Sequence, residues 1–156
     1  WHQPPDIDQV TRRRSITAKG LERFVQAQNP VIDVVKSELL LGVKRTHWMW
    51  FVFPQIFGLG HSFKAKKYGI TNLDEASEYL SHPLLGSRLR ECFRYVLKHS
   101  DRTAEEIFGY IDAKKFRSCA TLFKQVDRSE DSEFAQAIKI FYKGNPDRET
   151  LDLLYQ

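Results

Sequence analysis

The chain has 156 residues, of which 42% are hydrophobic and 28% are charged, a composition typical of a soluble globular protein. A chain of this length suits one domain, which can bury roughly two thirds of its unfolded surface without a disulfide or metal staple. The formal net charge of +4 is compatible with an anionic partner, and no apolar run approaches the length of a membrane-spanning helix.

The first residues, 1–17, differ from the rest of the chain. They contain Pro4-Pro5 and Arg12-Arg13-Arg14 but no apolar periodicity. We therefore predict a disordered basic arm over 1–17 and a single domain over 18–156. Neither a signal-peptide core nor a disulfide or metal spacing of Cys92 and Cys119 is present, so we expect a cytoplasmic protein with reduced core thiols.

Helical periodicity begins at Leu21, where the first predicted helix starts. That helix ends at Asn29-Pro30, and these two residues are typical of an N-cap followed by the first helical position. The second predicted helix therefore follows directly and ends at Gly42.

The next segment, Trp48–Pro54, is unusually apolar. Six of its seven residues are large hydrophobic side chains, and exposing them to water would cost several kcal/mol. Polar residues, His47 and Gln55, stand at its two ends. Periodicity over so short a run does not separate a buried strand from a buried helix. We favour a helix, because no other segment provides a convincing strand partner.

Capping residues mark the starts of the remaining helices. The predicted starts lie at Ser62, Asn72, Pro83, Thr103, Asp112 and Asp147, and one further helix carries Phe134 to Phe141 and closes at Gly144. Together these patterns predict an all-α fold, a single compact domain of roughly eight helices.

Several motifs in this order resemble the family called domain of unknown function 1810. They are Thr46–Gln55, Gly58-Leu59-Gly60, Tyr68-Gly69-Ile70, His82–Gly86, Glu105–Gly109 and Asp112–Phe123. The resemblance covers residues 21–155 and implies an all-α fold, but it implies no established activity. A further similarity, at the level of fold and motif style, is to the NADAR proteins, which act on ADP-ribose-type N-glycosidic bonds, and this similarity serves as an analogy.

Three polar residues are candidates for catalysis. His47 titrates near neutrality and is suited to general acid–base chemistry, while the alternative is a histidine that caps a helix or bonds a backbone carbonyl. Asp112 and Lys115 are candidates for acid–base and electrostatic roles, and the alternative for Asp112 is a plain N-cap.

Eight further residues are candidates for ligand binding: Trp48, Trp50, Gln55, Gly58, Gly60, Ser62, Tyr68 and Ser118. Tryptophans two residues apart on a helix point about 200° apart, so at least one belongs in the core and the other is a candidate stacking wall. The glycine pair before Ser62 resembles a phosphate cradle, with a plain turn as the alternative. We predict a pocket where His47 and Gln55 meet the loop 58–62 and the start of the Asp112 helix.

These residues favour a small intracellular enzyme or ligand-binding protein that acts on a nucleotide-like or ADP-ribose-like molecule, for example by N-glycosidic hydrolysis. The alternative is a non-enzymatic module that binds nucleic acid through Lys64, Lys66, Lys67 and the basic arm, or one that binds another protein. No His, Cys, Asp and Glu residues have metal-ligand spacing. We therefore expect no metal, no resident cofactor and no membrane partner.

Overall fold

The computed structural model describes residues 20–156. Five of its helices begin at a residue whose side chain accepts a hydrogen bond from a backbone N–H of the first turn. The capped helices are α4 (Phe63–Lys67), α5 (Leu73–Ser81), α7 (Ala104–Phe108), α9 (Glu133–Tyr142) and α10 (Arg148–Leu154). Their caps are Ser62, Asn72, Thr103, Ser132 and Asp147, of which all but Ser132 are predicted by the sequence. The predicted arm, residues 1–17, lies outside the described residues.

The other helices are residues 20–28, α2 (Ile32–Leu41), α3 (Met49–Val52), α6 (Leu85–Leu97) and α8 (Tyr110–Lys124). Residues 20–156 thus form ten helices and no strand, which confirms the all-α class. This number exceeds the predicted total of roughly eight, although the helices predicted one by one along the chain also number ten.

Three predicted helix starts are wrong. Helix α6 begins at Leu85 rather than at Pro83. Val31 rather than Asn29 precedes α2, and no side chain caps that helix. Gly109 ends α7 and also precedes α8, with a φ of 84° that favours glycine. Because the chain turns directly from one helix into the next at Gly109, Asp112 lies inside the first turn of α8 instead of capping it.

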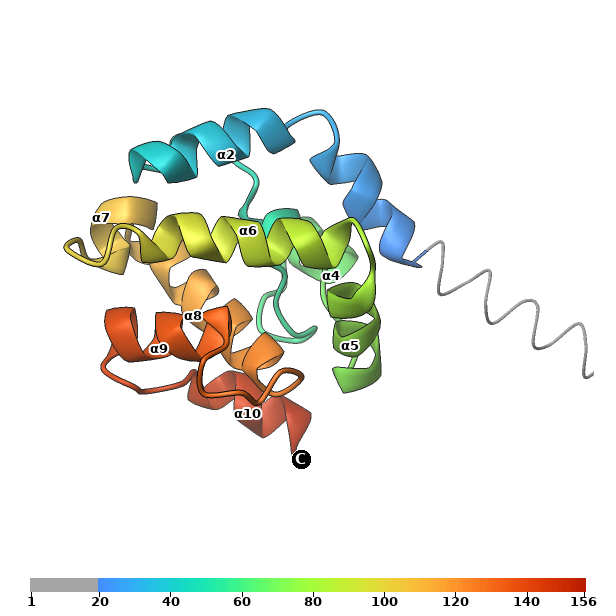
Figure 1. Cartoon of the computed structure of the whole chain (residues 1–156). Helices are drawn as coiled ribbons and strands as arrows, with labels where there is room; N and C mark the ends of the chain where they lie inside the picture. Colours follow the sequence, from blue (N-terminus) through green and yellow to red (C-terminus); the bar gives the residue numbers. More distant parts are fainter. Residues whose placement is uncertain (1–19) are drawn as a thin grey trace, which may run out of the picture.

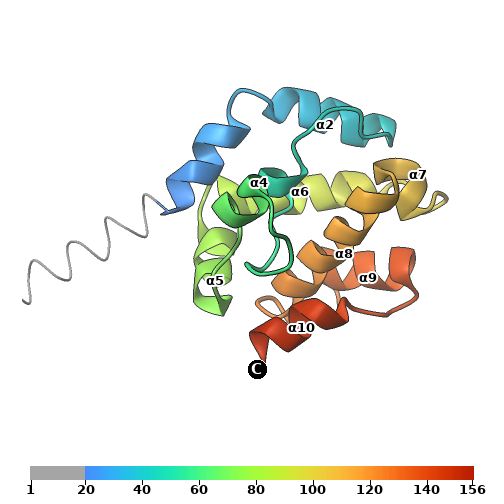
Figure 2. The ribbon, with the colours of Figure 1, turned by 180° about the vertical axis from the view of Figure 1, so that it is seen from behind.

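The long helix α6 crosses the centre of the molecule (Figure 1). It packs against α2 on one side and α9 on the other, while α8 packs against both α7 and α9. In the view from behind, the loop that joins α3 to α4 lies between α5 on one side and α8 and α10 on the other (Figure 2). This arrangement brings the segment after the apolar stretch next to α8.

The core is centred on Phe53, whose side chain is fully buried. Its ring centroid lies 5.1 Å from that of Phe116, 5.3 Å from that of Phe93 and 5.9 Å from those of Trp48 and Phe108. Most of these ring pairs are edge-to-face, a favoured geometry for aromatic packing. The predicted burial of residues 48–53 is confirmed for every residue except Trp50, which is half-buried.

The loop that leads into α3 is held by the buried carboxylate of Glu38, which is 6% exposed. Oε1 accepts hydrogen bonds from the backbone N–H of Arg45 (2.8 Å), that of Thr46 (3.1 Å) and the indole Nε1–H of Trp48 (3.0 Å). Oε2 accepts one from the Thr46 hydroxyl (2.6 Å). Burial alone would raise the pKa of Glu38, but these hydrogen bonds outweigh it and hold the pKa below its usual value of 4.5.

Cys92 and Cys119 are buried and unpaired, as predicted. Burial raises the pKa of the Cys92 thiol to about 12, which keeps it protonated and unreactive at neutral pH. Within residues 20–156, no helix combines the length and the apolar character needed to cross a membrane.

Candidate functional site

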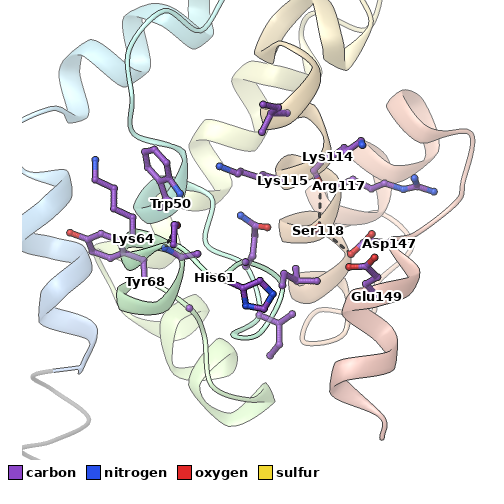
Figure 3. Close-up of a pocket in the computed structure, with 18 residues that line it drawn as sticks. Trp50, His61, Lys64, Tyr68, Lys114, Lys115, Arg117, Ser118, Asp147 and Glu149 are labelled. Atoms are coloured by element: carbon purple, nitrogen blue, oxygen red, sulfur yellow. Dashed lines mark hydrogen bonds between the residues drawn. The ribbon is translucent and has the colours of Figure 1, made fainter.

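A pocket of about 510 Å³ opens between the α3–α4 segment and the helices α8 and α10 (Figure 3). Its walls come from the single turn of α3, the loop 55–62, α4 with the turn that follows it, one face of α8 and the start of α10. Three separate stretches of the sequence, 50–69, 111–118 and 147–149, therefore meet at one cavity.

Seven of the residues predicted for a site line this pocket: Trp50, Gln55, Gly60, Ser62, Tyr68, Lys115 and Ser118. The cavity lies between the Gln55 end of the apolar stretch, the loop before α4 and the first half of α8, which are three of the parts named for the predicted pocket. Ser62 has a local role as well, because its Oγ accepts the backbone N–H of Ala65 and begins α4.

The other four predicted residues do not line the pocket. His47 is exposed on the loop before α3, and Gly58 faces Leu153 of α10. Trp48 is buried in the core, where its indole N–H donates a hydrogen bond to Glu38. Of these two tryptophans, Trp50 is the one that lines the cavity. The predicted meeting of His47 with Gln55 at the pocket is therefore wrong, since Gln55 lines the cavity and His47 does not.

Trp50 lies between two lysines of different helices. The Nζ of Lys64 (α4) and the Nζ of Lys115 (α8) each lie 4.6 Å from the centroid of the Trp50 ring. Figure 3 shows Lys115 reaching across the cavity toward Trp50, with Lys64 on the other side of the ring. Both distances are within the range of a cation–π contact.

Asp112, just outside the cavity, is shared by two lysines. Its Oδ2 lies 2.9 Å from the Nζ of Lys44, and its Oδ1 lies 3.6 Å from the Nζ of Lys115. Within the described part of the chain, no carboxylate lies within salt-bridge distance of Lys64. Lys44 and Lys115 thus share the carboxylate of Asp112, and Lys64 adds a third positive charge near Trp48 and Trp50. This excess positive charge favours an anionic ligand.

Five titratable residues of the pocket are absent from every prediction of the site: His61, Lys114, Arg117, Asp147 and Glu149. Lys114 follows from helical periodicity, since it lies four residues before the predicted Ser118. Asp147 reaches the pocket through tertiary contacts, because its Oδ2 lies 3.1 Å from the Ser118 Oγ and its backbone N–H donates to the Thr121 Oγ1 (2.8 Å). No local sequence pattern indicates that α10 packs in this way.

The next feature is the arrangement of the side chains that could act as metal ligands. Nowhere in residues 20–156 do three or more His, Cys, Asp or Glu side chains gather closely enough to hold a metal ion. The pocket therefore offers cations, carboxylates, an indole and amide or hydroxyl groups, which suit the binding of an organic anion.

Comparisons with known proteins give one family and one solved structure. A family model described as "Protein of unknown function (DUF1810)" matches residues 18–154. The crystal structure of the conserved hypothetical protein Rv1873 from Mycobacterium tuberculosis is similar, with 48% sequence identity and a TM-score of 0.84. The match covers 87% of this chain and 96% of that one. No curated protein matches the chain.

Proposed function

The chain belongs to the DUF1810 family, and we propose that it binds a small, anionic, nucleotide-like ligand in the pocket beside Trp50. The observation that carries the proposal is the position of Trp50 between the ammonium groups of Lys64 and Lys115 on the wall of a cavity. The volume of about 510 Å³ falls within the range of small-molecule sites.

When such a ligand enters, the lysine–indole contacts of Trp50 can be replaced by stronger contacts with the base and the phosphate of the ligand. A cation–π contact at an exposed site is worth about 0.5–1 kcal/mol, whereas a base stacked on an aromatic ring is worth about 1–3 kcal/mol. A lysine that leaves the indole for a phosphate gains a charge-assisted hydrogen bond, and the freed ring face is available to the base. A nucleotide supplies both the phosphate and the base.

Hydrolysis of an N-glycosidic bond in the ligand would need a carboxylate from outside the predicted catalytic set, of which Lys115 alone lines the cavity. His47 and Asp112 do not line the cavity, whereas the carboxylates of Asp147 and Glu149 do. A carboxylate beside the sugar is the group that stabilises an oxocarbenium-like transition state, while water takes the place of the departing base at the sugar carbon.

Binding is tested by calorimetric titration of the full chain with ADP, ADP-ribose and NAD⁺. We expect Lys115→Gln and Lys64→Gln each to raise Kd about tenfold, because each removes a charged partner of the phosphate. Binding should also quench the fluorescence of the wild type, and Trp50→Phe should abolish that quenching. Chromatography of the recovered nucleotides shows whether the base has been released, which would establish hydrolysis.

Lys98→Gln is the matched control, since Lys98 also lies over an aromatic ring, that of Tyr95 at 5.5 Å, but outside the pocket. It should bind as the wild type does. The proposal is wrong if none of the three nucleotides binds, or if Lys98→Gln weakens binding as much as Lys115→Gln.

A second candidate function, the binding of single-stranded nucleic acid, is supported by lysine–aromatic pairs at the surface. The Nζ of Lys67 lies 5.4 Å from the Tyr68 ring centroid, and the Nζ of Lys114 lies 4.3 Å from that of Tyr110. Lys66 is exposed nearby, as is Phe63, which is 78% exposed. Basic side chains interleaved with aromatic rings are typical of surfaces that bind single strands.

Titration of a single-stranded oligoribonucleotide at increasing salt tests this second function. We expect log Kd to rise linearly with the logarithm of the salt concentration, and Lys66→Gln to lower the slope by about one ion. Lys139→Gln, on the exposed face of α9, provides the comparison and should leave the slope unchanged. Identical slopes for all three proteins would exclude this surface as a nucleic-acid site.

A further inference from the structure

The two carboxylates that line the pocket lie together at one end of it. Figure 3 shows Trp50 and Lys64 at one end and the carboxylates of Asp147 and Glu149 at the other, where α10 begins. Across residues 20–156, no Lys, Arg or His nitrogen lies within salt-bridge distance of either of these carboxylates. They therefore retain acceptor capacity for a ligand.

Asp147 uses one of its two oxygens within the protein. Its Oδ2 accepts from the backbone N–H of Thr150 (3.1 Å) and from the Thr150 hydroxyl (2.5 Å), and it lies 3.1 Å from the Ser118 Oγ. These contacts fix the carboxylate at the edge of the cavity and begin α10. Glu149, which is exposed, follows in the first turn of the same helix.

A hydroxyl-bearing group suits this end better than a cationic one. The pocket is lined by four cationic side chains (Lys64, Lys114, Lys115 and Arg117) and two carboxylates, so its formal excess is two positive charges. A ligand ammonium at the α10 end would be repelled by Lys114 and Arg117, which lie there as well. A neutral hydroxyl donates to a carboxylate without that repulsion.

We propose that the ligand is a ribonucleotide whose phosphate lies between Lys64 and Lys115 and whose ribose diol donates hydrogen bonds to Glu149 and Asp147. This assignment rests on the proposed nucleotide-binding function and specifies the sugar. The two adjacent hydroxyls of the diol match the two neighbouring carboxylates, and recognition of a ribose hydroxyl by an acidic side chain is established in other nucleotide sites.

The test compares ADP with 2′,3′-dideoxy-ADP by calorimetry on the full chain. We expect the wild type to bind ADP about tenfold more tightly than the dideoxy compound, because hydrogen bonds to a charged acceptor are lost with the hydroxyls. Glu149→Gln should bind the dideoxy compound as the wild type does and should lose most of the preference for ADP. Glu149 is the better variant because Asp147 also caps α10.

Glu130→Gln, an exposed carboxylate outside the pocket, is the matched control and should keep the full preference. Equal Kd values of the wild type for ADP and the dideoxy compound would overturn the diol assignment and leave the nucleotide function intact. Failure of both compounds to bind would overturn the diol assignment, and it would overturn the nucleotide function as well if ADP-ribose and NAD⁺ also failed to bind. An undiminished preference in Glu149→Gln would also contradict the diol assignment.

Discussion

Replacing Phe53 with alanine is expected to lower the free energy of unfolding by about 3–5 kcal/mol. The Phe53 ring is fully buried and contacts four other aromatic rings, so its removal leaves a cavity that the surrounding helices cannot fill. For a domain of ordinary stability this is a large fraction of the total. Urea unfolding followed by far-UV circular dichroism measures the change.

Phe63→Ala makes the matching truncation at a side chain that is 78% exposed. It should change the free energy of unfolding by less than about 0.5 kcal/mol. Similar losses for the two variants would show that the aromatic cluster around Phe53 is not the centre of the core. Phe53→Leu, which keeps most of the volume, should recover part of the loss.

Glu38→Gln is expected to destabilise the protein by about 2–3 kcal/mol, even though the side chain keeps its size. The carboxylate of Glu38 accepts four hydrogen bonds, and an amide group in its place offers one acceptor oxygen and two donors. At least one donor of the loop before α3 is then left without its partner. The change is measured by urea unfolding at neutral pH.

The stabilisation by Glu38 depends on pH in a defined direction. The pKa of Glu38 in the folded protein lies below the usual value of 4.5, so the carboxylate stabilises the fold above that pH. This contribution is lost as the pH falls through the folded pKa. The difference between wild type and Glu38→Gln should therefore stay constant above the usual pKa of 4.5 and shrink as the pH falls below it.

Glu78→Gln, on an exposed position of α5, gives the comparison for a carboxylate at the surface. It should have nearly the stability of the wild type at every pH. A constant difference between wild type and Glu38→Gln across the acid range would contradict the role assigned to the charged form of Glu38.

Local signals in the sequence account for most of the fold. The capping box of Thr103 and Glu106 is present, and Ser62, Asn72 and Asp147 begin the helices they were expected to begin. Such caps depend on a few neighbouring residues and can be predicted without tertiary information. The prediction that Asp112 caps α8 is wrong because Gly109, with its positive φ, allows α8 to begin earlier, at Tyr110.

The candidate site could be predicted only in part, because it depends on contacts distant in the sequence. Spacing indicates that Trp48 and Trp50 diverge, but it does not indicate which of them is buried. The hydrogen bond to Glu38 decides the question in favour of Trp48. In the same way, the contribution of Asp147 depends on Ser118 and Thr121, which lie more than twenty residues earlier in the chain.

The shared carboxylate of Asp112 makes Lys115 an exchangeable counter-ion. When an anion draws Lys115 away, Asp112 still has Lys44, whose Nζ is the closer of the two at 2.9 Å and whose side chain is 6% exposed. Release of Lys115 therefore leaves no isolated negative charge at the edge of the core, a situation that would otherwise be strongly unfavourable. A lysine with a single counter-ion would have to break its pair before it could engage a ligand. In the proposed site, Asp112 would therefore keep Lys44 as its counter-ion when Lys115 turned toward an anion.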